Sequence, residues 1–193
     1  SPDGRMLAFV ARDSLGKDRL WIRPLHSLSA QPLPGTDGPY LPFWSPDGRF
    51  IGFFEDDKLK KIAASGGQPL TLCDAKNSRG GTWSSQGVIL FGIGTGPLQR
   101  VASSGGVPAP ATALDTVRQE SSHRFPFFLP DGHHFVYFAR AGTGRVEEDA
   151  VFVGSLDGNV KQLLLRNRTS AAYALGYLLY MQDQALMAQS LNT

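Results

Sequence analysis

The sequence predicts an all-β fold, and three features support this prediction. No window longer than about ten residues holds a helical period of apolar side chains, and the chain carries 22 glycines and 13 prolines. A turn motif recurs along the chain at nearly constant spacing. Only short apolar runs of strand length lie between its copies. Together these features predict a β-propeller built from four-stranded antiparallel blades, one for every ~40–45 residues.

The motif is clearest at residues 44–54, with the sequence WSPDGRFIGFF. Pro46 presets the backbone for a turn, the Asp47 carboxylate can accept hydrogen bonds from backbone N–H groups, and Gly48 takes the positive φ that other residues resist. The strand that follows is largely apolar on both faces. We therefore expect this strand to be covered on both sides by neighbouring sheets.

The glycine of the turn sets the register of the repeats. It stands at Gly4, Gly48, Gly87, Gly132 and Gly176, which are 44, 39, 45 and 44 residues apart. We expect one propeller domain over residues 1–193 with repeats at approximately 1–38, 39–78, 79–121, 122–167 and 168–193. The pattern indicates three strands, then three blades of four strands, then three strands, 18 in all.

The two incomplete blades lack an innermost and an outermost strand, so they do not complement each other in one ring. The sequence therefore predicts an open arc that is part of a larger propeller and a fragment of a longer chain. The incomplete terminal blades are expected to allow self-association.

Composition narrows the classes of partner. The 19 basic and 17 acidic residues are spread along the chain, which argues against nucleic acid because a nucleic-acid-binding protein favours a basic stripe. No apolar run is long enough for direct membrane insertion by this segment. The single Cys73 excludes an intramolecular disulfide and any multi-cysteine metal site. We expect no metal and no cofactor.

The phrase SPDGR followed by an apolar strand resembles the TolB-type, WD-like propeller repeats of bacteria. With LWIRPL at residues 20–25 and ASGGQP at residues 64–69, the chain is most similar to the propellers appended to membrane-anchored bacterial serine/threonine kinases. That resemblance implies a non-catalytic sensor or scaffold in an extracytoplasmic location, periplasmic or at the cell surface, with a cytoplasmic location left open. The kinase motifs themselves do not occur in these residues.

Similar repeats also form the amino-terminal propeller of prolyl-oligopeptidase-like hydrolases, which implies an alternative role as an accessory domain that gates substrate. A third alternative is a complete enzyme with its site on the channel face. Such an enzyme needs paired carboxylates, or a base near a nucleophile, on converging loops. Only Glu120, Glu147 and Glu148 are available, at a spacing that gives no support. The chain contains no Gly-x-Ser-x-Gly nucleophile motif.

Two other patterns are interpreted as structural. The recurring Asp3, Asp47 and Asp131 are expected to cap turns rather than bind calcium. The glycines at residues 92, 94 and 96 are expected to form an ordinary loop rather than a phosphate site, because Pro97 and a strand follow them.

Binding is expected on the loops that join strand four to the next strand one and strand two to strand three, because these loops share one face of a propeller. His123 and Arg124 are expected just before an innermost strand, where hydrogen bonding to neighbouring loops is favoured over ligand contact. The predicted partner is a protein, a peptide or a small ligand at the channel mouth. Replacing Arg118, Glu120 and Arg124 together with alanine is expected to abolish its capture and to spare thermal stability. The candidate contacts are Arg79, Arg118, Glu120, His123, Arg124, Glu147 and Glu148.

Overall fold

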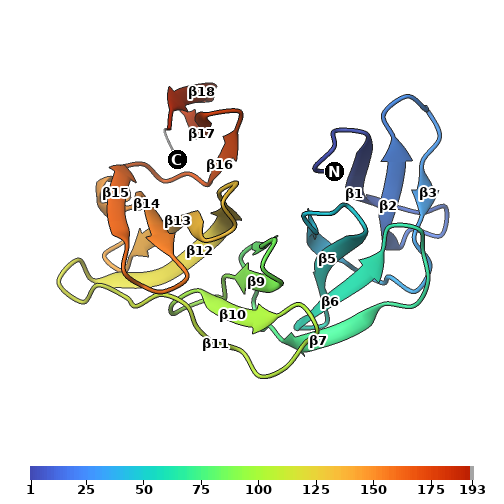
Figure 1. Ribbon diagram of the computed structural model, residues 1–193, viewed down its shortest axis with the longest axis horizontal. Helices are drawn as coiled ribbons and strands as arrows, with labels where there is room; N and C mark the ends of the chain where they lie inside the picture. The colour runs from blue at the N-terminus through green and yellow to red at the C-terminus, as the bar shows by residue number, and fades with distance from the viewer. Residues whose placement is uncertain (192–193) are drawn as a thin grey trace.

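The computed structural model describes residues 1–191 and shows five antiparallel sheets arranged around a central opening (Figure 1). Within these residues the one helical element is the 3-10 turn η1 (Val146–Glu148). The sheets contain three, four, four, four and three strands in chain order, which confirms the predicted propeller of about five blades. The five blades form an arc with a gap between the first and the last (Figure 1).

Each blade is one sheet whose strands pair in chain order. Blade one contains β1 (Met6–Arg12), β2 (Asp18–Pro24) and β3 (Gln31–Pro32). Blade two contains β4 (Tyr40–Trp44), β5 (Phe50–Glu55), β6 (Lys58–Ala63) and β7 (Leu70–Asp74). Blade three contains β8 (Gly81–Trp83), β9 (Val88–Phe91), β10 (Gln99–Ala102) and β11 (Ala109–Pro110). Blade four contains β12 (Glu120–Phe128), β13 (His134–Ala141), β14 (Ala150–Ser155) and β15 (Lys161–Leu165), and blade five contains β16 (Ala171–Ala174), β17 (Tyr177–Gln182) and β18 (Ala185–Ser190).

The core lies between blades rather than inside one. Ile51 and Phe53 of β5 join the cluster that blade one forms with Leu20, and both are fully buried. Phe54, on the other face of the same strand, packs toward Phe91 of blade three, with ring centroids 6.3 Å apart. Alternate residues of one strand thus serve two inter-blade layers. This confirms that the strand after the turn is covered on both sides.

The repeated turn is held by its serine as well as its aspartate. The Ser45 hydroxyl donates to Asp47 Oδ1 at 2.6 Å and accepts the Phe50 N–H at 2.9 Å. The same Asp47 oxygen accepts the Arg49 N–H at 3.0 Å. In repeat three, where Gln86 replaces the aspartate, the Ser84 hydroxyl donates instead to the Gly132 carbonyl of the next blade at 2.5 Å. The aspartates act as turn caps, as expected.

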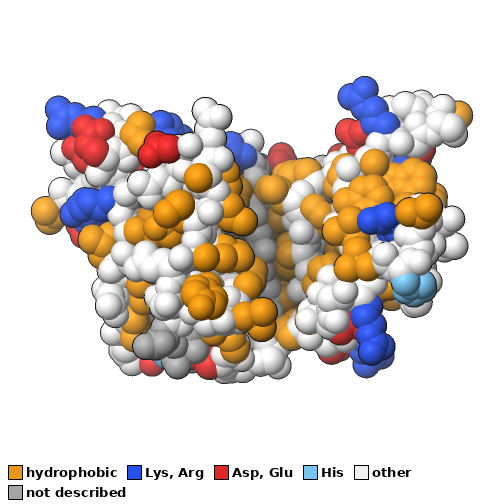
Figure 2. Space-filling model, turned by 90° about the horizontal axis from the view of Figure 1, so that it is seen from above, with side chains coloured by type: hydrophobic (Ala, Val, Ile, Leu, Met, Phe, Trp, Pro, Cys, Tyr) orange, Lys and Arg blue, Asp and Glu red, His pale blue; other side chains and the backbone are white. Residues whose placement is uncertain are grey.

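On the face of the propeller that carries these turns, the innermost strands line an apolar cavity of about 580 Å³. Its walls include the aromatic side chains of Trp44, Trp83 and Phe128. Phe128 is buried, and Phe50 stacks on Trp83 with ring centroids 6.2 Å apart. Viewed from above, the opening of the arc is a deep cleft with many hydrophobic side chains on its walls (Figure 2).

Candidate functional site

Two loops of blade four come together on the face expected to bind. Residues 115–119 precede β12, and residues 142–149 follow β13. Arg118 joins them, because its guanidinium donates to the Glu148 carbonyl at 3.0 Å. Between the loops lies a cavity of about 470 Å³, lined by Val117, Arg118, Gln119, Thr143, Arg145, Glu148 and Arg166.

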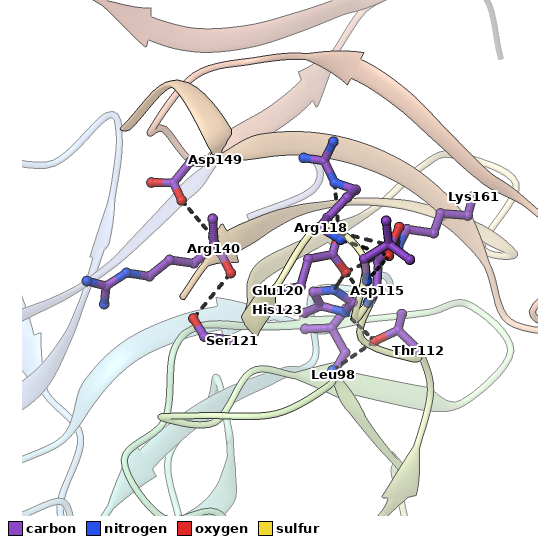
Figure 3. Close-up of polar contacts among 12 residues, drawn as sticks. Leu98, Thr112, Asp115, Arg118, Glu120, Ser121, His123, Arg140, Asp149 and Lys161 are labelled. Carbon is purple, nitrogen blue, oxygen red and sulfur yellow. Dashed lines mark hydrogen bonds and ion pairs between the residues drawn. The ribbon is translucent and has the colours of Figure 1, made fainter. Parts of the chain in front are cut away.

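Beneath this cavity Glu120 is the centre of a buried polar network (Figure 3). One carboxylate oxygen of Glu120, Oε2, accepts the Asp115 N–H at 2.7 Å and lies 3.0 Å from His123 Nε2 and 3.1 Å from Lys161 Nζ. Arg118 Nε lies 3.4 Å from the other oxygen but makes no directed hydrogen bond, so this contact is an ion pair. The network connects the loop before β12 to the outer strand β15.

Hydrogen bonds dominate the ionisation of Glu120. Burial alone would raise the pKa of its carboxyl group, but hydrogen bonds from His123, the Asp115 N–H and Lys161, with the charge of His123, lower that pKa to about 2. Glu120 is therefore ionised at neutral pH. A carboxylate with such a low pKa is a poor general base there, so its role in this network is structural.

Both ring nitrogens of His123 also have polar partners. Its Nδ1 lies 2.7 Å from the Thr112 hydroxyl, whose oxygen in turn accepts the Leu98 N–H at 2.9 Å. Its ring is completely buried and packs on Tyr137 with centroids 4.7 Å apart. The expected hydrogen bonding to neighbouring loops is confirmed. Buried Glu120 and His123 hold the loops and are not available for direct contact with a partner.

The other basic residues of the network pack on an aromatic ring. The Arg118 guanidinium lies 5.3 Å and Lys161 Nζ 5.1 Å from the centre of the Phe152 ring. Cations over aromatic faces are attracted by the ring quadrupole. The Arg118 side chain is therefore fixed by Phe152, by Glu120 and by the Glu148 carbonyl before any partner arrives.

The remaining candidate residues occupy different surroundings. Glu147 is exposed in η1, and Glu148 is half-buried beside Arg145, with Nη1 and Oε1 3.3 Å apart. Arg79 and Arg124 lie on the inner side of the arc, where the Phe125 N–H donates to the Arg79 carbonyl at 2.7 Å. Arg118, Glu147 and Glu148 thus share the loop cavity region, whereas Arg79 and Arg124 form a separate group.

The sequence places Arg124 ahead of its strand, but β12 already begins at Glu120. The glycine-bearing loop before β10 explains the early start. His123 donates its N–H to the Gly96 carbonyl at 2.9 Å, and Gly96 donates to the Ser121 carbonyl at the same distance. At Gly92 a Cβ atom would lie 2.8 Å from the Arg79 carbonyl oxygen. The glycines therefore serve close chain packing, as the loop interpretation requires.

Four charged residues in or beside these loops are not among the candidate contacts predicted from the sequence. Arg140 lies near the end of β13, Asp149 is completely buried, and Arg145 and Arg166 line the loop cavity. All four fall within or beside loops that the repeat register predicts. Nothing in their spacing shows which loops meet, so the register finds the loops but not these side chains.

Comparison with known proteins rests on structure. No family model and no curated protein sequence matches the chain. The putative TolB from Agrobacterium tumefaciens aligns with a TM-score of 0.73 and 20% identity, over 86% of this chain and 62% of that one. This chain folds as a TolB-like propeller. TolB from Acinetobacter baumannii gives a TM-score of 0.71 at 14% identity, over 97% of this chain and 50% of that one.

The TolB-like fold also occurs in an enzyme. Acylaminoacyl peptidase from Pyrococcus horikoshii aligns with a TM-score of 0.62 at 14% identity, over 93% of this chain and 34% of that one. At these identities the likeness concerns the fold alone. The chain spans 62% and 50% of the length of the two TolB structures. Within residues 1–191 no helix is long and apolar enough to cross a membrane.

Proposed function

We propose that this propeller is a non-catalytic binding module that captures a protein, a peptide or a small ligand on its loop face. The observation that supports this proposal most directly is the charged cavity between residues 115–119 and 142–149. Its walls are fixed in advance, because Asp115 Oδ1 accepts the Val117 and Arg118 N–H groups and Arg118 binds the Glu148 carbonyl. A site that is already ordered loses less entropy on binding.

A photo-crosslinking experiment tests the face. A benzophenone side chain is placed at Glu147 on the loop face, or at Arg49 on the opposite turn face, and each protein is incubated with an extract of the source cells. We expect a discrete crosslinked product from position 147 and none from position 49. The purified product should then bind the unmodified chain, and an Arg145→Ala/Glu147→Ala variant should bind it at least about tenfold more weakly. Equal crosslinking from both positions contradicts the proposal.

The finer proposal is that the module is the extracytoplasmic sensor of a bacterial receptor-like serine/threonine kinase. The quoted sequence motifs support it. The alternative is a substrate-gating propeller of a prolyl-oligopeptidase-like hydrolase, which the similarity to the Pyrococcus peptidase favours. The gene on either side of this segment separates them. A kinase domain with a membrane-spanning segment supports the sensor, and a domain with a Gly-x-Ser-x-Gly motif supports the gate.

We also propose that the chain self-associates through its end blades. Blades two to four each lie between two neighbours, whereas blades one and five have one each (Figure 1). Leu7 on blade one is 42% exposed, and Met181 and Leu186 on blade five are 48% and 69% exposed. Burial of apolar surface of this kind drives association.

Sedimentation velocity tests self-association. We expect the weight-average mass to rise with protein concentration across the micromolar range, and Leu186→Lys to shift the association to at least about fivefold higher concentration, because a charged edge residue opposes sheet pairing. Gln162→Lys, an exposed change on blade four, serves as the control. A constant monomer mass over the whole range contradicts the proposal.

A further inference from the structure

Arginines gather on the inner side of the arc, outside the loop cavity. Arg124 comes from β12, Arg140 from the end of β13, and Arg168 from the segment before β16. They line one cavity of about 290 Å³ together with Phe125, Phe138, Thr169 and Ser170. Arg79, which precedes β8, lies close to Arg124 through the hydrogen bond from the Phe125 N–H to the Arg79 carbonyl.

Among the described residues, Arg168 is the only member of this group that forms an ion pair with a carboxylate. Arg168 Nε lies 2.5 Å from Asp149 Oδ2, and the other oxygen of buried Asp149 accepts the Ala141 N–H at 2.8 Å. Arg124 donates to the Ser122 hydroxyl at 2.8 Å and to the Gly94 carbonyl at 3.2 Å, both neutral groups. Arg79 donates to the Ser78 carbonyl at 3.1 Å. Arg79 and Arg124 thus have no ion-pair partner within residues 1–191.

Arg140 is the least constrained of the group. Its guanidinium makes no hydrogen bond or ion pair with any residue in the described part of the chain, and its side chain extends away from Glu120 and His123 (Figure 3). Its five N–H donors therefore remain free for a ligand in the cavity. The backbone of Arg140 is fixed, because Arg140 pairs with Ser122 in the sheet.

The positive charges of these arginines repel one another, and a bound anion would offset this repulsion. Partial burial lowers the pKa of Arg124, and repulsion from Arg140 and Arg79 lowers it further, while Asp149 acts in the opposite direction. Like charges held together in a partly buried cleft are typical of sites that bind the opposite charge.

We propose that this arginine cavity binds the oxyanion group, carboxylate or phosphate, of a small ligand. The planar fork of a guanidinium matches both groups in bidentate fashion. A cavity of about 290 Å³ suits a small polycarboxylate or phosphate monoester, and the rings of Phe125 and Phe138 provide an apolar wall for its body. The inference rests on the proposed binding function and names the chemistry of one ligand site within it.

Isothermal titration calorimetry in a phosphate-free buffer of low ionic strength tests this site. Inorganic phosphate and citrate are titrated separately into the full chain and into Arg140→Gln. We expect at least one anion to bind the unmodified chain, and Arg140→Gln to weaken that binding about tenfold or more, since a hydrogen bond to a charged group is lost. Binding of phosphate alone or of citrate alone supports the site and assigns its ligand class.

Arg49→Gln is the matched control, because it removes the same charge from an exposed turn. We expect this variant to bind within about twofold of the unmodified chain. No heat with either anion, or equal weakening in both variants, overturns the inference. Because the Arg140 side chain has no polar partner among residues 1–191, its variant should keep the thermal midpoint, and the bound anion should raise that midpoint only in proteins that retain Arg140. Crosslinking from Glu147 without anion binding overturns this site alone, whereas anion binding without crosslinking contradicts the loop-face proposal alone.

Discussion

Replacing Glu120 with alanine is expected to lower the free energy of unfolding by about 3 kcal/mol. Removing one partner of a buried ion pair costs ~3–5 kcal/mol because the other groups lose their compensation. Here the Asp115 N–H and His123 would lose their acceptor. The value should lie at the lower end of the range, since Lys161 and Arg118 retain some access to solvent. Urea unfolding followed by tryptophan fluorescence measures the change.

Glu147→Ala is the control for this experiment, because Glu147 is an exposed carboxylate on the same face. We expect its free energy of unfolding to stay within about 0.5 kcal/mol of the unmodified chain. If the two variants lost equal stability, the buried network of Glu120 would not contribute as the geometry indicates.

The same network predicts a dependence on pH. The pKa of the Glu120 carboxyl group is about 2 in the folded protein, whereas the ordinary pKa of a glutamate side chain is 4.5. A carboxyl group with a lowered folded pKa stabilises the protein fully above its unfolded pKa, and this stabilisation is lost as pH falls through the folded pKa. Stability should therefore fall between about pH 4.5 and pH 2, and more steeply in the unmodified chain than in Glu120→Ala.

The burial of Glu120 argues against one expectation from the sequence. Replacing Arg118, Glu120 and Arg124 together with alanine was expected to spare thermal stability, but Glu120 is buried and has three hydrogen-bonded partners. Loss of binding by that triple variant would be confounded by loss of folding. Arg145 and Glu147 are the better choice, because both side chains are exposed.

Phe54→Ala is expected to cost about 3–5 kcal/mol of folding free energy, the usual range for removing a buried aromatic side chain. Phe54 is completely buried between blades two and three. Its ring lies 5.7 Å from that of Tyr40, 6.0 Å from that of Phe43 and 6.3 Å from that of Phe91, measured between centroids. The cavity left by alanine would border all three rings, which are fixed by their own strands.

Phe127→Ala provides the matched comparison, since Phe127 is 37% exposed. Its cost should stay below about 1.5 kcal/mol, and both variants can be measured by urea denaturation with the same fluorescence signal. A Phe54→Ala protein as stable as Phe127→Ala would show that the layer between blades two and three contributes little to stability.

Strand positions could be predicted from the sequence because local chemistry sets them. The motif at residues 44–54 predicts a strand directly after its turn, and β5 begins there at Phe50. The turn at Pro46, Asp47 and Gly48 defines where one strand ends and the next begins. The alternation of apolar side chains then requires neighbours on both faces, which gives the stacked blades.

The assembly of the site could not be predicted in the same way. Glu120 and His123 are polar residues in a sequence context that indicates a loop, yet they lie in β12, where Thr112 and Lys161 from distant segments satisfy them. The pairing of β12 with β13 shifts register between Arg124 and Phe127, and Phe125 has a positive φ. The simple alternation of side chains along β12 is therefore interrupted at this point. Such features depend on contacts across repeats, which a single sequence does not display.

The gap between blades one and five has a mechanical consequence. In a closed ring the rotations between successive blades must add up to one full turn, so each interface is constrained by the others. In an arc the curvature is the accumulated rotation at the four interfaces between blades. The side-chain layers around Ile51 and Phe54 fill two of these interfaces, and their thickness sets the rotation there. When one side chain in such a layer changes, the resulting displacement of a blade grows with its distance along the arc. The width of the opening should therefore respond to packing between blades far from either end.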